Sequence, residues 1–371
     1  MKRPVDASLV GAISCATRSV REVSTGCPVL PSLRLAFPGR SLDRCLVDVR
    51  LISEDGVQQR SPDDIKALLD GPGLVWIDVK YWDAETARSL AGALGLHQRA
   101  VRDCAVGSRV PKVHVYPDQV FLVMHALERD GNGRVHYIEL AQFVGSNWLL
   151  TVHGPMDAEV SLDAAYVETR SIARKLESAR LRPGRADELS GAVVTAMIVR
   201  LREFLTELTH ESWSLERQVT AGHVGDPEQF LEELFGVRHG LLAARTVAVL
   251  SREVFGRMAR LSVFGPAGAA QLDDLEDQLR RLAAVADSQR EYLHGVIEFY
   301  QTRIGTKMTI AAERLAVIAA VTLPVTALSS VVGMNVIVNE QTRVGELVVL
   351  LVLMTVMSVI LLVWTKRKGW W

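Results

Sequence analysis

The sequence has few cysteines, and their spacing excludes the sites that cysteines usually build. There are four, Cys15, Cys27, Cys45 and Cys104, with no CxxC pair among them. A structural zinc cage or a disulfide framework needs cysteines at paired spacings. We therefore expect neither of these, and we expect the soluble part of the chain to lie in a reducing cytosol.

The sequence also lacks net charge and a phosphate-binding loop. The formal net charge is −1 over 371 residues, and no basic stripe is interleaved with aromatic residues, so we expect no nucleic-acid partner. No GxxxxGK[ST] motif is present, which argues against ATP-driven chemistry. His97, His125, His136 and His153 match no metal or triad spacing, so an enzyme is disfavoured and no cofactor is expected.

Two long apolar segments are present near the C-terminus. Residues 315–332 and 347–364 each contain 18 residues without a charge. At about 1.5 Å per residue each would span roughly 27 Å, close to the ~30 Å hydrocarbon core of a bilayer. We predict a first membrane span over residues 308–332, an outer loop over 333–346 and a second span over 347–364.

Basic residues near the two segments predict how the chain is oriented in the membrane. Arg303, Lys307 and Arg314 precede the first segment, and a cluster at 366–368 follows the second, whereas the loop between them has only Arg343. Basic residues accumulate on the cytoplasmic side. We expect a multi-pass protein of the plasma membrane with both termini, including the basic-aromatic tail 365–371, in the cytoplasm.

The soluble region begins with two dissimilar parts. Residues 1–46 have the composition of a disordered basic leader. Residues 47–156 alternate between β-like and helical runs, which predicts an α/β domain. The expected strands are 47–52, 75–79, 113–116, 119–125, 135–143 and 148–152, and the expected helices are 63–69 and 84–94. Asp130 to Gly133 is interpreted as a hairpin turn, because Arg134 occupies the next ligand position of a calcium loop.

Residues 157–307 are helical in pattern, with breaks at 183–184, 222–227 and 265–266. The breaks predict long antiparallel helices. From Ala267 one helix should continue into the first span, over a length on the order of 90 Å. A helix of that length needs neighbours or copies of itself to be stable. The fold class is thus an α+β membrane protein in which long helices follow an α/β cytoplasmic domain.

One face of the first span is made almost entirely of small or hydroxyl-bearing residues. At alternating steps of three and four they are Thr309, Ala312, Ala316, Ala319, Leu323, Thr326, Ser330 and Gly333. Two spans cannot enclose an aqueous path, so transport requires several chains around an axis. The alternative reading is close packing of small residues in a dimer.

The chemistry of this face favours a hydrated divalent cation. It offers hydroxyls, an amide and backbone carbonyls. Mg²⁺ gives up its water shell reluctantly, so neutral oxygens that bond to the shell suit it. The spans lack the Cys and His ligands that favour zinc or copper, which puts Mg²⁺ ahead of Zn²⁺, with Co²⁺ and Ni²⁺ as further cargo. A divalent ion gains roughly 4.6 kcal/mol on entering across 100 mV, twice the single-charge value.

The tripeptide Gly333-Met334-Asn335 follows the first span directly. Gly333 permits the backbone to leave the helix, Met334 supplies a flexible apolar side chain, and Asn335 can direct an amide oxygen to a pore entrance. We therefore predict a turn at the outer mouth.

These residues resemble the CorA family of magnesium and cobalt transporters, whose mark is a Gly-Met-Asn at the end of the first of two C-terminal helices. The similarity extends over residues 47–371 and includes Val75-Trp76-Ile77-Asp78, Pro111-Lys112-Val113, Leu150-Thr151-Val152-His153, Pro324-Val325-Thr326 and the tail from Thr365 to Trp370.

The resemblance implies a funnel-shaped homopentamer in the lipid bilayer, with the first span lining the pore. Family pore positions fall on Thr309, Leu315, Leu323, Thr326 and Asn335. The family also senses cytoplasmic Mg²⁺ between protomers, at positions that correspond here to Asp274 and Glu298.

The sequence departs from the family pattern at Val332, Val336 and Thr309, where Tyr, Phe and Asn are usual. Two alternatives stay open beside a passive Mg²⁺ channel. One is a Zn²⁺ transporter of the same superfamily, and the other is a membrane-anchored signalling or scaffold protein.

Overall fold

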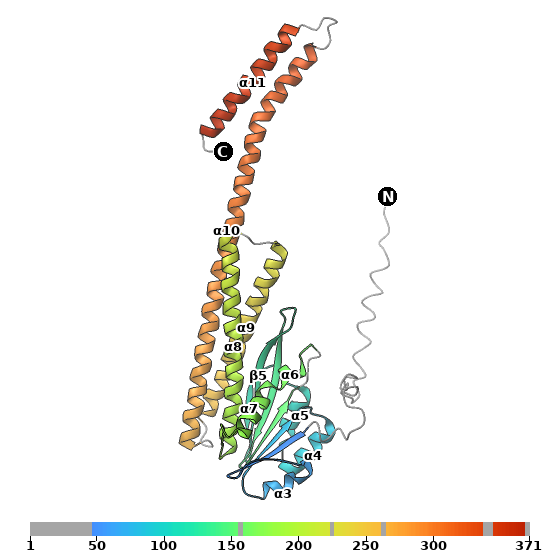
Figure 1. Cartoon of the computed structure of the whole chain (residues 1–371), viewed down its shortest axis with the longest axis vertical. Helices are drawn as coiled ribbons and strands as arrows, with labels where there is room; N and C mark the ends of the chain where they lie inside the picture. The colour runs from blue at the N-terminus through green and yellow to red at the C-terminus, as the bar shows by residue number, and fades with distance from the viewer. Residues whose placement is uncertain (1–46, 155–158, 223–225, 261–264, 337–343, 368–371) are drawn as a thin grey trace, which may run out of the picture.

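The computed structural model describes residues 47–154, 159–222, 226–260, 265–336 and 344–367. The expected leader, with Cys15, Cys27 and Cys45, lies outside the described residues, as do positions 337–343 of the loop and the last four residues of the tail. The described part forms an N-terminal domain around a sheet, a helical bundle beside it, and a helix that extends far beyond both (Figure 1).

A seven-stranded mixed sheet forms the centre of the N-terminal domain, in the order β2-β1-β3-β7-β6-β5-β4. Within it β3 and β7 run parallel and the other neighbours run antiparallel. Every residue of β3 and β7 is buried. Strands covered on both faces are mostly apolar, and the polar exceptions here are Asp78, Thr151 and His153. The strands are β1 (Val47–Ser53), β2 (Gly56–Arg60), β3 (Leu74–Val79), β4 (Lys112–Val115), β5 (Val120–Arg129), β6 (Val135–Val144) and β7 (Trp148–His153).

Helices cover both faces of the sheet. Side chains alternate between the faces along each strand, so each face presents its own apolar residues to a layer of helices. On one face Ile77, Phe121 and Leu150 pack with the short helices that follow β2 and β3. On the other face Trp76 and Leu122 pack with the long C-terminal helices. The first group of helices comprises η1 (Pro62–Asp64), α3 (Ile65–Leu69), α4 (Ala84–Leu94) and α5 (Gln98–Val106); the second begins with α6 (Leu162–Ala165), α7 (Val167–Glu177) and α8 (Ala186–Ala221).

Three long helices form an antiparallel bundle: α8, α9 (Pro227–Met258) and α10 (Gly265–Val336). Gly222 ends α8 in the left-handed conformation, with φ 82°, and the Asp226 carboxylate caps α9 by accepting the Glu228 N–H at 2.9 Å. The predicted long helix is confirmed, since α10 has 72 residues, about 108 Å of helix. Its upper part rises past the bundle, where α11 (Val344–Arg367) packs beside it (Figure 1).

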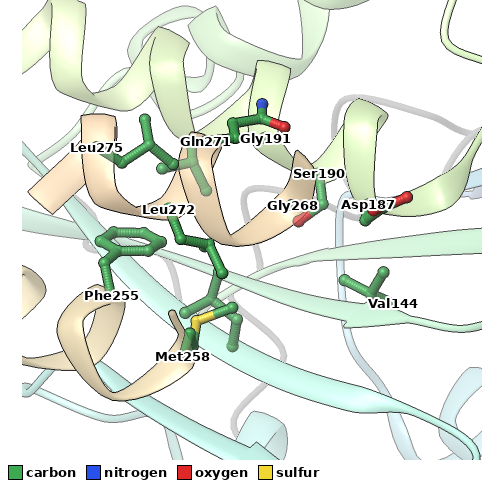
Figure 2. A pocket seen from close by; sticks show the side chains of 12 residues that line it. Val144, Asp187, Ser190, Gly191, Phe255, Met258, Gly268, Gln271, Leu272 and Leu275 are labelled. Carbon is green, nitrogen blue, oxygen red and sulfur yellow. The ribbon is translucent and has the colours of Figure 1, made fainter. Parts of the chain in front are cut away.

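The lower end of α10 encloses a small cavity against α8, α9 and the sheet. Figure 2 shows Leu272 and Leu275 of α10 beside Phe255 and Met258 of α9, with Gly191 of α8 opposite. The cavity measures about 30 Å³, room for roughly one water molecule. It is a packing gap in the bundle, too small for a substrate site.

The sequence pattern missed β2 and α5. All but one of the residues of β2 are exposed, so the strand has no apolar alternation, and its place comes from pairing with β1 at the sheet edge. Helix α5 is short, and its start depends on a local cap, the His97 Nδ1 that accepts the Arg99 N–H at 3.3 Å. Neither signal is visible in hydrophobic periodicity.

Candidate functional site

Among the described residues, one helix is long and apolar enough to cross a membrane, and it is the Gly268–Ser330 part of α10. Only 6% of its most apolar 18-residue window is buried within the chain. An equally apolar helix in the core of a soluble protein would be covered by neighbours. The exposed apolar surface therefore indicates contact with lipid or with other chains.

Two opposite faces of this part of α10 differ in their cover. The expected small and hydroxylated face is exposed at every described position: Thr309, Ala312, Ala316, Ala319, Leu323, Thr326 and Ser330. Leu315 and Leu323 are each 67% exposed. The covered positions lie at helical spacing on the other side and are Val317, Ala320, Val321, Pro324, Val325 and Leu328. On a helix of 3.6 residues per turn the two sets are centred about half a turn apart.

Helix α11 supplies the cover. It packs against α10 and runs back beside its upper end (Figure 1). The least exposed described positions of α11 are Met354, Met357, Ser358, Leu361 and Thr365, which share one face. The rest of α11 is apolar and exposed, with Val349 69% and Ile360 62% accessible. Among the described residues, the small face of α10 is therefore uncovered. Helix α11 is covered mainly along the face that packs against α10.

The hydroxyls on the open face are oriented by their own helix. Thr309 Oγ1 donates to the Gly305 carbonyl at 3.0 Å, and Thr326 Oγ1 donates to the Thr322 carbonyl at 2.8 Å. Each hydroxyl has one hydrogen and two lone pairs. Because the hydrogen is used within the helix, the oxygen remains as an acceptor. Such an oxygen can accept a hydrogen bond from the water shell of a cation.

The position of Gly333-Met334-Asn335 differs from the prediction. We expected a turn from Gly333, but α10 continues through Val336, so the three residues belong to its last turn. A glycine near the end of a helix permits an exit but does not require one, and helix ends shift easily by one or two residues. The side chains of Met334 and Asn335 lie outside the part of the chain that the structure describes.

Between the bundle and α11, the part of the chain that the structure describes leaves α10 uncovered. Every residue from 304 to 316 is exposed, including Met308 at 68%. Below this segment Tyr300 packs on Phe230 of α9, with ring centroids 4.9 Å apart. The bare segment holds the expected pore residue Thr309, which no described residue of the chain covers.

The two predicted Mg²⁺-sensing residues lie apart on α10. Asp274 is exposed and accepts a hydrogen bond from Gln278 Nε2 at 2.8 Å. Glu298 is exposed and lies 3.5 Å from His294 Nε2. They are 24 positions apart on one helix, about 36 Å. One chain therefore cannot bind a single ion with both, and each would need ligands from elsewhere.

A group with metal-ligand chemistry that the sequence reasoning missed lies in the N-terminal domain. Ligand atoms of Asp130, His136 and Glu159 lie within 4.8 Å of one another. The tetrad from Asp130 forms the hairpin turn that we predicted, since Asp130 Oδ1 accepts the N–H groups of Asn132 and Arg134 at 2.8 and 2.9 Å. Asp130 and His136 straddle this turn, which was a usable signal; Glu159, 23 positions later, gave none.

The other sheet histidines have structural partners. His153 Nε2 lies 3.2 Å from Asp78 Oδ1 and 3.3 Å from Thr169 Oγ1. Burial alone would raise the pKa of Asp78, but the His153 charge and hydrogen bonds from His153 and Thr151 outweigh burial and lower it. His125 Nε2 is 2.5 Å from the Ser108 carbonyl oxygen, and its pKa is lowered chiefly by burial. Both rings are thus held inside the packed sheet through Nε2, while the buried Nδ1 of each has no hydrogen-bond partner among the described residues.

Comparisons with known proteins place these observations in a family. A family model described as CorA-like Mg²⁺ transporter protein matches residues 71–368. The cobalt/magnesium transport protein CorA of Thermotoga maritima is 22% identical over 349 residues, which are 92% of this chain and 97% of that protein.

Solved structures show the same fold. The CorA magnesium transporter of Methanocaldococcus jannaschii matches with a TM-score of 0.73 at 17% identity, over 88% of this chain and 99% of that one. The full-length CmaX protein matches with a TM-score of 0.69 at 17% identity, over 90% and 100% of the two chains.

Proposed function

The chain belongs to the CorA-like family of divalent metal transporters, and we propose on that premise that it is a passive channel for Mg²⁺ uptake. The observation that carries the proposal is the open face of α10. This face has seven described positions from Thr309 to Ser330, and all are exposed. Six of them are small or hydroxylated, and the seventh is Leu323. The opposite face of the helix is covered by α11. A pore needs this asymmetry, because one face must meet water while the other is packed.

The pore is formed by several copies of this chain, and we propose five. One open helix face cannot enclose a path, so identical faces must meet around an axis. The bare segment from 304 to 316 supports this arrangement, since its exposed apolar residues include Met308 and Leu315. Neighbouring copies of α10 would cover these side chains at the membrane surface. Leu315 and Leu323 would then narrow the pore, and Thr309, Thr326 and Asn335 would line it.

The cation travels with its water shell. The Thr309 and Thr326 hydroxyls already donate their hydrogens to helix carbonyls at 3.0 and 2.8 Å, so in the proposed pore their oxygens would act as acceptors. Water bound to Mg²⁺ is a hydrogen-bond donor, and rings of neutral acceptors pass it without removing the shell. The membrane potential drives inward flow, on the order of 4.6 kcal/mol per 100 mV for two charges.

The membrane arrangement follows from the two terminal helices. We propose that α11 is a second span outside the pore, with its exposed apolar face toward lipid. Its last turn carries Lys366 and Arg367, which favours a cytoplasmic C-terminus. The sheet domain and the bundle then lie in the cytoplasm of a plasma-membrane protein, with Gly333-Met334-Asn335 at the outer end.

Asp274 and Glu298 are proposed as contacts for cytoplasmic Mg²⁺ between copies. Both are exposed on α10 and neither can share an ion with the other within one chain. Carboxylates from a neighbouring copy would complete each site, and Mg²⁺ would hold the copies together when the ion is abundant in the cell.

The proposal is tested by ion flux into liposomes that contain the purified protein. Mg²⁺ should enter under an inside-negative potential, and Asn335→Ala should reduce the entry by tenfold or more. Ile360→Val, on the exposed face of α11, is the matched control and should leave the flux unchanged.

The same liposomes distinguish the alternatives. Zn²⁺, Co²⁺ and Ni²⁺ are each offered with and without a pH gradient, and a Zn²⁺ flux that requires the proton gradient would replace Mg²⁺ by Zn²⁺ as the cargo. Absence of flux for every ion, with intact oligomers, would instead favour the membrane-anchored signalling or scaffold role.

A further inference from the structure

Three side chains of different segments meet at the tip of the β5–β6 hairpin. Asp130 begins the turn, His136 is the second residue of β6, and Glu159 lies between β7 and α6. His136 Nε2 is 3.3 Å from Asp130 Oδ2 and 3.6 Å from Glu159 Oε2. The hairpin projects from the end of the sheet alongside the bundle (Figure 1).

The spacing of these atoms fits a tetrahedral transition-metal site. A Zn²⁺ ion binds nitrogen and carboxylate oxygen at about 2.0–2.2 Å. Two ligands of a tetrahedron at that radius are about 3.3–3.6 Å apart, which are the separations found from His136 to Asp130 and to Glu159. The third separation lies within 4.8 Å. A small rotation of the half-exposed Glu159 side chain would complete three corners, and water would occupy the fourth.

The remaining atoms of the three residues hold the ligands in position. Asp130 Oδ1 is fixed by the N–H groups of Asn132 and Arg134 at 2.8 and 2.9 Å, which turns Oδ2 toward His136. The His136 side chain is 8% exposed, so packing restricts its ring. Arg134 approaches the other oxygen of Glu159, Oε1, at 3.6 Å. The first two ligands are therefore held by the fold before any ion binds.

The donor set selects the class of ion. Imidazole with carboxylates suits Zn²⁺, Co²⁺ and Ni²⁺, whereas Mg²⁺ prefers six oxygens. Another nearby carboxylate, Glu128, lies opposite His136 across the two strands, but it accepts a hydrogen bond from Arg200 Nη2 at 2.6 Å. Two carboxylates and one imidazole thus define the site.

We propose that Asp130, His136 and Glu159 bind one Zn²⁺- or Co²⁺-class cation per chain, separate from the transport pathway. The ion ties the β5–β6 hairpin to the segment that leads into α6. The neighbouring Arg129 donates hydrogen bonds to both carboxylate oxygens of Glu211 in α8, at 2.7 and 2.6 Å. Ion binding at the hairpin therefore acts next to a direct contact with the helical bundle.

Calorimetric titration of the purified full-length protein with Zn²⁺ tests the proposal, with Co²⁺ titration followed by visible absorption as a second readout. Glu159→Gln keeps the size of a half-exposed side chain and removes its carboxylate ligand. His136→Gln removes the imidazole ligand. Each should abolish one Zn²⁺ equivalent per chain and the intense absorption of tetrahedral Co²⁺. Wild-type protein, but neither variant, should also melt at a higher temperature with Zn²⁺.

Two controls separate this site from other binding. His239→Gln changes an exposed histidine of α9 and should keep the full Zn²⁺ stoichiometry. Asn335→Ala should also keep it, even where transport is lost, because the hairpin is remote from the proposed pore. Equal Zn²⁺ binding by wild type, Glu159→Gln and His136→Gln would overturn the proposal and leave the three residues as an ion-pair cluster only.

Discussion

Arg303 of α10 donates a hydrogen bond to the carbonyl oxygen of Thr220, in the last turn of α8, at 2.8 Å. The same guanidinium nitrogen also donates to the Val219 carbonyl. The last carbonyls of a helix have no partner within the helix and carry partial negative charge. Arg303 supplies both the donors and the opposite charge, at the last point where α10 contacts the bundle before its bare segment begins.

Arg303→Met should therefore loosen the top of the bundle. The loss of charge-assisted hydrogen bonds is expected to destabilise the cytoplasmic part by about 1–3 kcal/mol, at the lower end because Arg303 is partly exposed. Thermal unfolding and protease cleavage near residue 222 would measure it. Arg290→Met is the control, since Arg290 pairs with Asp287 on an exposed surface of the same helix, where such a pair contributes little. Equal stability of the two variants would contradict the capping role.

Gly222→Ala should destabilise the same junction by a different route. Gly222 has φ 82°, and an added Cβ would clash with Arg303 Nη2. An alanine in the left-handed region costs about 1–2 kcal/mol, and the Arg303 side chain would also be displaced. Gly92→Ala, in the exposed interior of α4 with no atom within 4 Å of its Cβ, should instead stabilise by about 0.5–1 kcal/mol. Melting temperatures that move in opposite directions would support the assignment.

Arg200→Met should be the most destabilising of these changes. Arg200 Nη1 donates to Glu168 Oε1 at 2.9 Å and to the Ala164 carbonyl at 2.8 Å, and Glu168 is 3% exposed. Removal of the arginine leaves a buried carboxylate without its cation, a loss of about 3–5 kcal/mol. Arg170→Met, which breaks an exposed pair with Asp163, should change stability by under about 1 kcal/mol. Denaturation of both variants in parallel would check the difference.

Asp78→Asn should change the response of stability to acid. The pKa of Asp78 lies below its ordinary value of 3.8, so the unfolded chain binds a proton at a higher pH than the folded chain. The ionised group therefore stabilises the fold above about pH 4, and that contribution is lost as pH falls through the lowered pKa. The variant should be less stable at neutral pH and show a shallower decline below about pH 4. Asp163→Asn, an exposed carboxylate on α6, should retain the wild-type decline.

Thr326→Val should lower Mg²⁺ flux several-fold, and Thr326→Ser should retain most of it. Valine has the shape of threonine but lacks the oxygen that would accept from the cation's water shell, whereas serine keeps it. Flux in liposomes at a fixed potential would measure both. Equal flux through the two variants would remove the hydroxyl from the permeation mechanism.

The α/β domain and the long helix could be predicted because their signals are periodic and local. Strand β3 is apolar except for Asp78, and the Leu272, Leu275 and Leu279 stripe marks the buried face of α10. Strand β2 and helix α5 could not be found in this way, since one depends on pairing with β1 and the other on the His97 cap. The end of α10 was also misplaced, because a glycine permits a turn without forcing it.

The sequence by itself determined which face of α10 is small and polar, since a 3.6-residue period assigns each side chain to a face without knowledge of its neighbours. Only the tertiary structure decided that α11 covers the opposite face and that Arg303 joins α10 to α8. It also brought Glu159 to Asp130 and His136. Contacts between distant segments depend on how helices and strands pack, and the free energy of that packing is shared among many residues, so no local pattern records it.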